Sequence, residues 1–298
     1  MIFDRYREVI PNFSQFLEAL QRPLPVVLRT NLLKADPSRL RAELEARGCR
    51  VTAYAWCPAC LRVEGLDSPG STLEYFLGHY HPQAITSVLP VLALDPQPGE
   101  LVLDLCAAPG GKTSHMAERM RNQGLILAND VRPDRLKALR GKLDRLGVMN
   151  AAVTMYRGEQ YPGAVRPQRV LVDAPCSAEG TLRAPEAFRR RPANGFLRRI
   201  SGLQRRLLRR ALELVVPGGV VVYSTCSYAP EENEEVVAEV LEAMPGVSLE
   251  EIDLPVEHSP GLRAWNGRRF PPSIERCVRV YPHQLDGTGF FIARLVKR

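Results

Sequence analysis

Two short apolar runs in this sequence each end in a small polar turn that carries one cysteine. Residues 220–224 are mostly valine and lead to Cys226, and residues 169–172 lead to Asp173 and Cys176. Such runs are typical of strands buried in a parallel sheet, and reactive groups in an open α/β sheet gather at the carboxyl ends of the strands. Two interpretations follow: a thiol nucleophile beside an acid–base group, or two buried cysteines packed as small apolar side chains. The occurrence of the motif twice favours the first.

The chain from residue 100 onward alternates between strand-like and helix-like segments, which predicts a parallel, doubly wound α/β sheet. The expected strands are 101–105, 125–129, 151–155, 169–173 and 220–224. The expected helices are 112–121, 133–146, 197–215 and 231–243. The last two apolar segments, 277–281 and 290–296, are joined by a turn that contains glycine, and they predict an antiparallel hairpin that completes the sheet.

Residues 1–95 are predicted to form a separate, smaller unit. Apolar residues at helical spacing over 6–20 and a strand-like run at 26–31 begin it. The segments that follow suggest a helix at 36–47, strands at 50–56 and 61–64, and a linker helix at 82–92. This order predicts a small N-terminal α+β domain over 1–95, with the main domain over 96–298 after a proline- and glycine-containing boundary.

Composition excludes several classes of protein. The chain has 298 residues, of which 45% are apolar and 24% are charged, as in ordinary globular proteins. No apolar run approaches the ~20 residues that a membrane span requires. The first residues lack the layout of a signal peptide, and seven cysteines in no regular framework fit a reducing compartment. We therefore expect a cytoplasmic protein without membrane contact. Nothing in the composition indicates the oligomeric state, and a monomer is the expectation.

One pair of cysteines, Cys57 and Cys60, has the spacing of metal ligands. A zinc site would need two further ligands, and only Cys49, His79 and His81 lie nearby in the sequence. A single C-x-x-C lacks the second half of the zinc signature. The interpretation as two unrelated cysteines is therefore favoured, and we predict no metal.

The formal net charge of +7 is concentrated in one segment. Residues 183–210 contain ten arginines and a single acid, Glu186. A basic cluster beside a candidate active site is typical of a surface that contacts a phosphate backbone. The alternative is a helix face that is merely solvated.

The first predicted strand of the main domain ends in a turn of small residues, 105–111, that would let a ligand approach the backbone. A P-loop is incomplete here, because Cys106 occupies the position of its first glycine, and no G-x-G-x-x-G fingerprint is present. A third interpretation is an adenosine-type ligand whose ribose is held by an acid at the end of the next strand. Asp130 is such an acid, and this arrangement suits S-adenosylmethionine.

Residues 103–113, 173–177 and 223–227 together resemble, in this order, three motifs of the Nop/Sun group of RNA cytosine-5 methyltransferases, most closely its RsmF-like members. Shorter similarities extend to 29–31, 56–58, 73–75 and 289–294, so the resemblance covers nearly the whole chain. It implies a Rossmann-like class I methyltransferase sheet, mostly parallel with the C-terminal antiparallel hairpin, behind the small N-terminal domain.

The resemblance also implies where S-adenosylmethionine binds. Asp130 would hold the ribose, Arg135 would lie near the cofactor, and Asp173 would lie between cofactor and target base. The loop residues that would line the cofactor are Cys106, Ala107, Ala108, Pro109, Gly110, Gly111 and Lys112. One departure concerns Arg157, which stands where the family usually has an acid near the adenine. The chain is also expected to lack the C-terminal RNA-binding domain of longer relatives.

The chemistry implied by the resemblance uses both strand-end cysteines. Cys226 would add to carbon 6 of cytosine, because thiolates are strong nucleophiles at neutral pH, and Cys176 would assist loss of the carbon-5 proton and release of the enzyme. Asp173 would hydrogen-bond the base, with Lys112 pointing into the same pocket; a solvated Lys112 is the alternative.

The substrate is expected to be RNA, with the target cytosine in a single strand or loop, because the base must leave any stack to react. Ribosomal RNA is favoured over transfer RNA by the similarity to RsmF-like proteins. A hypothesis of another class is an RNA-binding assembly factor with a silent site, which Arg157 and the missing C-terminal domain would support.

Overall fold

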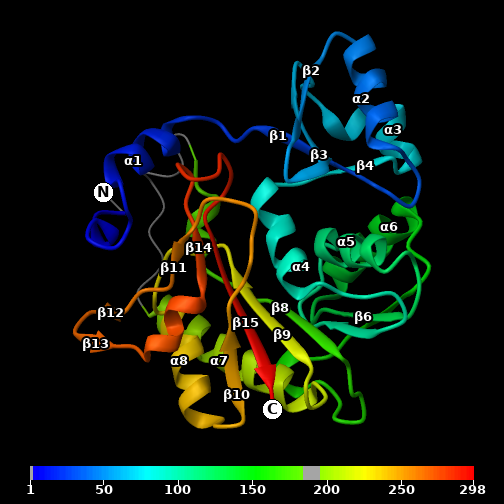
Figure 1. Cartoon of the computed structure of the whole chain (residues 1–298). Helices are drawn as coiled ribbons and strands as arrows, with labels where there is room; N and C mark the ends of the chain where they lie inside the picture. Colours follow the sequence, from blue (N-terminus) through cyan, green and yellow to red (C-terminus); the bar gives the residue numbers. More distant parts are fainter. Residues whose placement is uncertain (1–2, 184–194) are drawn as a thin grey trace.

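The computed structural model describes residues 3–183 and 195–298, which form a small and a large domain (Figure 1). The large sheet has the strand order β11-β14-β15-β9-β8-β5-β6-β7, with β10 paired to β15. Its parallel part consists of β5 (Leu101–Asp104), β6 (Leu125–Asn129), β7 (Ala151–Thr154), β8 (Arg169–Asp173) and β9 (Val220–Thr225). The predicted doubly wound sheet is therefore confirmed.

The C-terminal part of the large sheet is antiparallel, as predicted. Strand β15 (Phe290–Lys297) pairs antiparallel with β9 on one side, in the register Ala293↔Tyr223. The other antiparallel strands are β10 (Val247–Glu250), β11 (Ser259–Pro260) and β14 (Val278–Val280). A two-stranded ribbon, β12 (Ala264–Trp265) with β13 (Arg268–Arg269), projects beside them.

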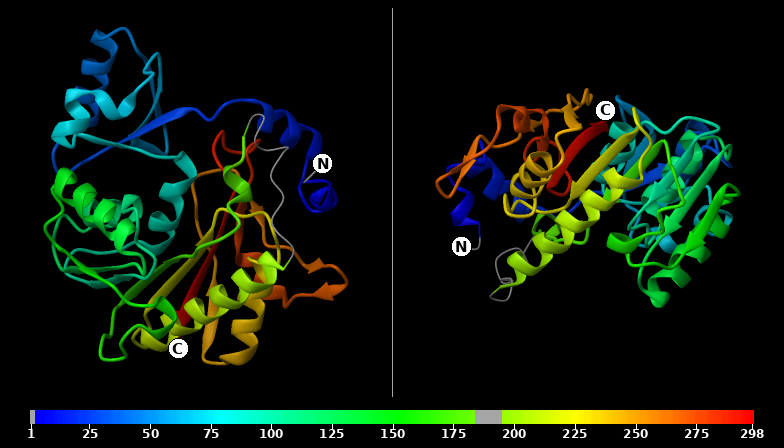
Figure 2. Two further views of the ribbon diagram at one scale, coloured as in Figure 1. Left: turned by 180° about the vertical axis from the view of Figure 1, so that it is seen from behind. Right: turned by 90° about the horizontal axis from the view of Figure 1, so that it is seen from below.

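Helices cover both faces of the large sheet, and the two side-chain sets of each strand enter different cores (Figure 2). Strand residues Val102, Leu171 and Val222 pack in the core that includes helices α4 (Leu89–Leu94) and α5 (Gly111–Arg119). The alternate residues of the same strands pack in the core of α7 (Phe196–Leu214) and α8 (Glu234–Ala243). Helix α6 (Pro133–Leu146) packs beside α5. This alternation is the period-2 pattern of a sheet buried on both faces.

The small domain is an antiparallel sheet in the order β2-β3-β1-β4 with two helices, which confirms the predicted α+β architecture. Its strands are β1 (Val26–Thr30), β2 (Arg50–Tyr54), β3 (Cys57–Glu64) and β4 (Tyr80–Pro82), and its helices are α2 (Pro37–Ala46) and α3 (Leu73–Leu77). Asp36 caps α2 by accepting hydrogen bonds from the backbone N–H groups of Ser38 and Arg39.

Two N-terminal helices begin later than the sequence pattern predicted. The helix expected over 6–20 is a 3₁₀ turn followed by α1 (Phe13–Gln21), because Asn12 adopts a left-handed conformation with φ of 48°. The helix expected over 82–92 is wrong at its start: Pro82 pairs with Leu28 as the end of β4, and α4 begins at Leu89 after a 3₁₀ turn. At Pro82 strand pairing overrides apolar periodicity, whereas at Asn12 the local backbone conformation interrupts the helix.

Residues 3–20 pack on the large domain and not on the small sheet (Figure 1). Phe16 of α1 makes edge-to-face contacts with Phe3 and with Tyr228, at ring-centroid distances of 5.6 and 5.3 Å. The division of the chain between residues 95 and 96 stays a prediction. No helix in the described ranges is long and apolar enough to cross a membrane.

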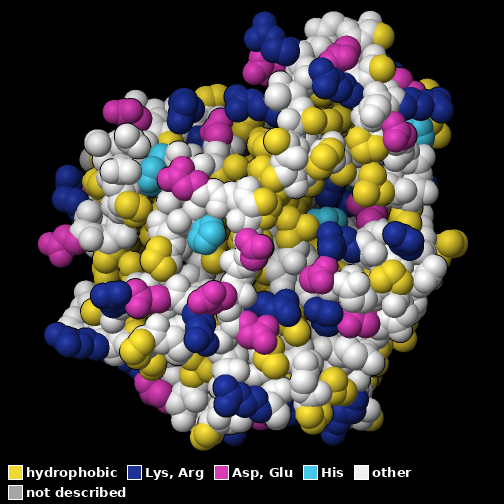
Figure 3. All heavy atoms as spheres, in the orientation of Figure 1, with side chains coloured by type: hydrophobic (Ala, Val, Ile, Leu, Met, Phe, Trp, Pro, Cys, Tyr) yellow, Lys and Arg dark blue, Asp and Glu magenta, His cyan; other side chains and the backbone are white. Residues whose placement is uncertain are grey.

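The described part of the arginine-rich segment, Arg183 and residues 195–210, does not form a single basic surface. Residues 184–194, with three of its arginines, lie outside the described residues. Arg183 is buried and pairs with Asp286 at 3.0 Å, so its predicted contact with a phosphate backbone is wrong. On α7, acids neutralise Arg205, Arg209 and Arg210. Figure 3 likewise shows basic and acidic side chains interspersed on one face of the molecule.

Candidate active site

The two strand-end cysteines meet at the carboxyl edge of the large sheet. Strands β8 and β9 are parallel neighbours, with Asp173 opposite Ser224, so the turns that follow them lie side by side. The Sγ atoms of Cys176 and Cys226 are 3.2 Å apart. Both cysteines are partly exposed, so the alternative of two inert core cysteines does not describe them.

Lys112 and Asp173 form an ion pair at the same edge. The Lys112 Nζ lies 2.7 Å from Asp173 Oδ2, and the Ser224 hydroxyl donates to Asp173 Oδ1 at 2.9 Å. The Lys112 side chain is 15% exposed and its ammonium lies 5.2 Å from the ring centroid of Phe290. Lys112 therefore points into the site, and the alternative of a solvated lysine at the start of a helix is wrong.

The two thiols lie in unequal electrostatic surroundings. The hydrogen bond with Cys176 lowers the pKa of Cys226, and the Lys112 ammonium adds to this effect. The same hydrogen bond and burial raise the pKa of Cys176 well above its ordinary value. Cys226 is thus the thiol more easily ionised.

Glu232 holds both cysteine turns in place, and the sequence analysis missed it. Its carboxylate accepts from the Ser227 hydroxyl at 2.7 Å and from the Ser177 backbone N–H at 2.9 Å. Gln204 of α7 donates to the same carboxylate and to the carbonyl of Pro175. A signal was present, because Glu232 belongs to the acidic run 231–235 that directly follows the Cys226 motif.

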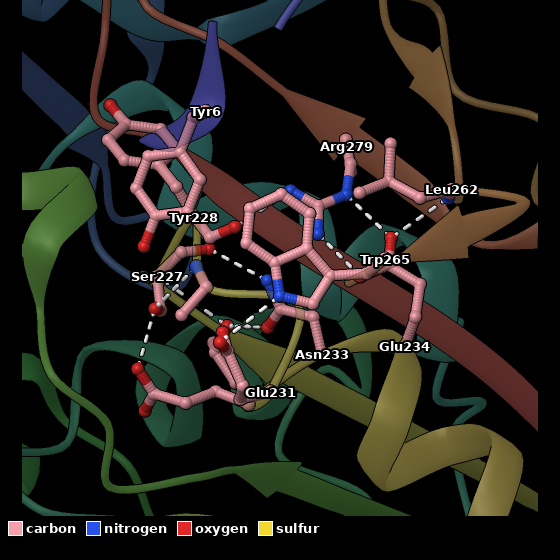
Figure 4. A network of polar contacts seen from close by, with 12 residues as sticks. Tyr6, Ser227, Tyr228, Glu231, Asn233, Glu234, Leu262, Trp265 and Arg279 are labelled. Atoms are coloured by element: carbon pink, nitrogen blue, oxygen red, sulfur yellow. Dashed lines mark hydrogen bonds and ion pairs between the residues drawn. The ribbon is translucent and has the colours of Figure 1, made fainter. Parts of the chain in front are cut away.

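A second hydrogen-bond network, centred on Asn233, holds the turn after Cys226 in place (Figure 4). Asn233 accepts a hydrogen bond from the Thr225 hydroxyl at 2.6 Å and donates to the carbonyl of Ser227 at 2.9 Å. Behind it, the Arg279 guanidinium forms a buried ion pair with Glu234. The turn is therefore held by groups that are all shielded from water, which is how a reactive side chain is kept in one orientation.

The predicted cofactor loop joins β5 to α5. Ala107 donates its backbone N–H to the carbonyl of Asn129, and Gly110 closes the turn with a φ of 98°. This positive φ is strained for any residue with a Cβ, which also would lie 2.7 Å from Leu139 Cδ1, so glycine is favoured here. Arg135 donates to the loop carbonyl of Ala108.

Asp130 and Arg135 lie together at one end of a cleft of about 610 Å³. Arg135 Nη1 is 3.2 Å from Asp130 Oδ2, and Asp130 is nearly buried. The cleft continues past the apolar side chain of Leu207 to Asp173, and its far wall contains Cys176 and Cys226. Most of the predicted cofactor and catalytic residues therefore line this one cleft: Cys106, Ala108, Asp130, Arg135, Asp173, Cys176 and Cys226. The exceptions are Ala107, Pro109, Gly110, Gly111 and Lys112.

A smaller pocket of about 190 Å³ also adjoins the cofactor loop, and it shares Cys106, Ala108 and Asp173 with the larger cleft. It is lined by the remaining loop residues Ala107, Pro109, Gly111 and Lys112, with Gly110 adjoining as the N-cap of α5. Residues that the sequence analysis did not assign, His81, Gln83, Ser87 and Lys142, complete it. They were missed because the small domain contributes two of them from β4 and the residue that follows it.

Arg157 lies at the rim of the larger cleft and is paired with an acid. Its guanidinium is 3.0 Å from Glu159, whose side chain is 11% exposed and also lines the cleft. Glu159 thus provides an acid at this end of the cleft, two residues after Arg157, where the family resemblance led us to expect one.

Cys57 and Cys60 lie close together, with Sγ atoms 2.7 Å apart. Within residues 3–183 and 195–298, no group of three or more His, Cys, Asp or Glu side chains could hold a metal ion.

Comparison with known proteins identifies the family to which this site belongs. A model of the 16S rRNA methyltransferase RsmB/F family matches residues 91–296. The chain belongs to the RsmB/F methyltransferase family. The ferredoxin-like domain that accompanies RsmF/B-like methyltransferases matches residues 2–67, so both domains of this RsmB/F protein have counterparts in the family.

The RsmB/F protein is similar to named RNA methyltransferases. It is 42% identical over 99% of its length to a mouse 28S rRNA (cytosine-C(5))-methyltransferase, of which it covers 38%. It is 36% identical, again over 99% of its length, to the tRNA (cytosine(49)-C(5))-methyltransferase of Pyrococcus abyssi, of which it covers 95%. The chain spans 36–48% of the length of the four eukaryotic relatives that it matches.

A solved structure with the same fold is a methyltransferase homologue from Pyrococcus horikoshii. It superposes with a TM-score of 0.87 at 36% identity, over 99% of this chain and 94% of that one. The Rossmann-like class I methyltransferase sheet predicted from the sequence is therefore confirmed.

Proposed function

We propose that this chain is an RNA methyltransferase that transfers a methyl group from S-adenosylmethionine to carbon 5 of cytosine. The observation that carries the proposal is the pair of cysteine sulfurs, 3.2 Å apart, beside the Lys112–Asp173 ion pair on the wall of a cleft. Membership of the RsmB/F family and the names of the relatives support the same reaction.

The cleft fits the proposed cofactor in its chemistry. Asp130 offers a carboxylate to ribose hydroxyls at one end, and Leu105 and Leu207 give an apolar wall for a flat base. Glu159 lines the same end and offers an acceptor to an amine. The loop residues 106–112, with Arg135 and Asp173, would hold the rest of the molecule. Bound there, S-adenosylmethionine supplies an electrophilic methyl group on its sulfonium.

Cys226 is assigned as the nucleophile. Its thiolate adds to carbon 6 of the ring, and the electron pair of the 5,6 double bond moves toward carbon 5, which becomes nucleophilic. Methylation of carbon 5 is followed by loss of its proton, and the Cys226–carbon bond breaks as the double bond re-forms. The lowered pKa of Cys226 favours the first of these events, since thiolate is the attacking species.

Cys176 and the ion pair are assigned to proton handling and orientation. The raised pKa of Cys176 keeps it as a thiol beside the Cys226 thiolate. After Cys226 has bonded to carbon 6, Cys176 would release its proton to solvent and its thiolate would accept the carbon-5 proton. The thiol so formed would then donate a hydrogen bond to the Cys226 thiolate as it departs. Asp173 accepts from Lys112 and Ser224, and its fixed carboxylate would hydrogen-bond N3 or the exocyclic amine when the thiol adds.

The proposed substrate is a cytidine in single-stranded or loop RNA. Ribosomal RNA is favoured, because the family description and the mouse relative both name it. Transfer RNA is the alternative that the Pyrococcus abyssi relative supports. Bisulfite mapping of both RNA classes, from cells with and without the gene, would locate the modified position; an unchanged pattern in ribosomal RNA would contradict the preference.

The central experiment compares two cysteine variants on one RNA substrate. Cys226→Ala should abolish methyl transfer while RNA affinity stays as in the parent. Cys176→Ala should accumulate a covalent protein–RNA complex, seen as a retarded band on a denaturing gel. Cys49→Ala, at a buried cysteine of the small domain, serves as the control and should behave as the parent.

The outcomes also separate this proposal from a silent RNA-binding factor. A parent protein that binds RNA and cofactor but transfers no methyl group to any RNA would contradict the enzyme. Transfer that survives in Cys226→Ala would contradict the assignment of the nucleophile.

A further inference from the structure

Within the described residues, two polar side chains that line the smaller pocket, those of His81 and Gln83, each have a buried nitrogen atom without a hydrogen-bond partner. These atoms are His81 Nδ1 and Gln83 Nε2. Lys142 of α6 is half-buried, and no acid in the described part of the chain pairs with it. All three line the same pocket of about 190 Å³. Unpaired buried polar groups cost free energy, so a pocket that collects two of them beside the Lys142 ammonium favours a polar ligand that can accept hydrogen bonds.

The neutral imidazole of His81 and the ammonium-bearing side chain of Lys142 flank the first turn of α5. A Cβ on Gly111 would lie 3.1 Å from His81 Nε2, and one on Gly110 would lie 3.6 Å from Lys142 Cδ. Gly110 caps the nine-residue helix without a side-chain hydrogen bond. The first N–H groups of a helix have no intrahelical acceptor and carry partial positive charge. His81, Lys142 and these amides therefore surround the same point.

The acids that line the pocket do not neutralise this charge. Asp173 is already paired with Lys112 at 2.7 Å. Asp104 accepts from the Thr113 hydroxyl, and burial raises its pKa to about 7. Burial together with Arg29 and Arg145 lowers the pKa of Lys142 to about 8 and holds the pKa of His81 well below its ordinary value. The lowered pKa values of Lys142 and His81 agree with a pocket in which positive groups face one another without an anion between them.

The position of the pocket indicates which anion it takes. Lys112 and Asp173 line both the pocket and the edge that carries the two cysteines. The surface is hollowed below the small domain, and a histidine and basic side chains lie in this hollow (Figure 3). A polynucleotide that delivers a base to the cysteines would therefore run past His81 and Lys142.

We propose that His81, Gln83 and Lys142, with the first turn of α5, form a subsite for a phosphodiester of the RNA strand that carries the target base. The inference rests on the proposed function, because that function makes the strand RNA. The subsite positions the strand and takes no part in the chemistry. A cofactor carboxylate is the competing anion, and the test separates the two.

The test measures binding of a fluorescein-labelled, single-stranded 12-nucleotide RNA with one cytidine, over a series of salt concentrations. Lys142→Met should weaken binding about tenfold at low salt. It should also reduce the slope of log K against log salt by about 0.7, the value for one phosphate contact on a single strand. Lys137→Met, at an exposed lysine of the same helix, should change neither quantity.

A second variant, His81→Phe, tests whether RNA binding depends on a hydrogen bond from this side chain as well as on the positive charge of Lys142. It should weaken RNA binding several-fold and leave the salt slope unchanged, because His81 is neutral at pH 7.5. The melting temperature of Lys142→Met should equal or exceed that of the parent, since the variant removes a half-buried ammonium without a partner. Binding of S-adenosylhomocysteine, measured by calorimetry, should be unchanged in both variants.

A parent-like salt slope in Lys142→Met would overturn the proposal. So would a loss of S-adenosylhomocysteine affinity with RNA binding intact, because the pocket would then belong to the cofactor. Failure of the proposed function is seen separately, as absence of methyl transfer in the parent protein, and it leaves the binding measurements interpretable.

Discussion

Arg29 and Glu118 form an ion pair that joins the small domain to α5, and neither side chain is more than 4% exposed. Arg29, on β1, also donates to the Ser114 hydroxyl at 2.9 Å and lies 3.4 Å from the carbonyl of Gly111. Arg29 therefore binds α5, the helix that carries Lys112 in its first turn. The small domain is therefore anchored to the element that shapes the site.

Removal of one partner of this buried pair should be costly. Arg29→Met leaves the Glu118 carboxylate buried and unpaired, and we expect the free energy of unfolding to fall by about 3–5 kcal/mol, as measured by urea denaturation. Arg39→Ala breaks an exposed pair with Glu43 and should cost less than about 1 kcal/mol. The double variant Arg29→Met/Glu118→Leu should regain much of the loss, and equal losses in the Arg29 and Arg39 variants would contradict the expectation.

The proposed ribose contact predicts a specific loss of cofactor affinity. Asp130→Asn removes the charge that would strengthen hydrogen bonds to ribose hydroxyls, and S-adenosylhomocysteine should bind about tenfold or more weakly by calorimetry. Asp134→Asn changes an exposed acid four residues later and should bind as the parent does. Parent-like affinity in Asp130→Asn would place the ribose elsewhere.

The pairing of the two thiols predicts how Cys226 ionises. Alkylation of Cys226 by iodoacetamide, followed by peptide mass spectrometry, should reach half its maximal rate at a pH below 9, since Cys176 stabilises the thiolate. Cys176→Ala removes this donor and should move the midpoint to higher pH, whereas Cys176→Ser should keep part of the shift through its hydroxyl. Identical midpoints in the parent and in Cys176→Ala would show that the hydrogen bond has no such effect.

Asp104 predicts a pH dependence of stability. Burial raises its pKa to about 7, so between the unfolded value near ~4 and pH 7 the native state holds a proton that the unfolded chain has lost. Stability contributed by Asp104 is therefore full at low pH and falls as pH rises to 7, by at most about 1.4 kcal/mol per pH unit. Asp104→Asn, which can still accept from Thr113, should lack this fall.

Denaturation of the parent and Asp104→Asn proteins at pH 5, 6, 7 and 8 would measure the effect. The stability advantage of the variant should grow up to pH 7 and then level off. An advantage that stays constant, or that shrinks with rising pH, would refute the raised pKa.

The parallel strands, the C-terminal hairpin and the small α+β domain could be predicted because each depends on a local pattern. Strand β9 is a run of β-branched residues, and α6 shows apolar residues at helical spacing with Gly147 at its end. The errors fall where a distant partner decides the conformation. Pro82 became a strand residue because β1 pairs with it, and Arg183 became a core residue because Asp286 lies beside it.

By itself the sequence determined which residues can carry the chemistry: two cysteines, Asp173 and Asp130, each directly after an apolar strand. Only the tertiary structure decided that Cys176 and Cys226, fifty residues apart, lie 3.2 Å from each other. It also decided that Glu232 accepts hydrogen bonds from both cysteine turns, and that His81 of the small domain lies beside Gly111 of the cofactor loop. The physical reason is the separation along the chain over which each interaction acts. Strand and helix patterns are set by neighbours along the chain, whereas the distance between two strand ends depends on the order of strands in the sheet and on the packing of every layer around it.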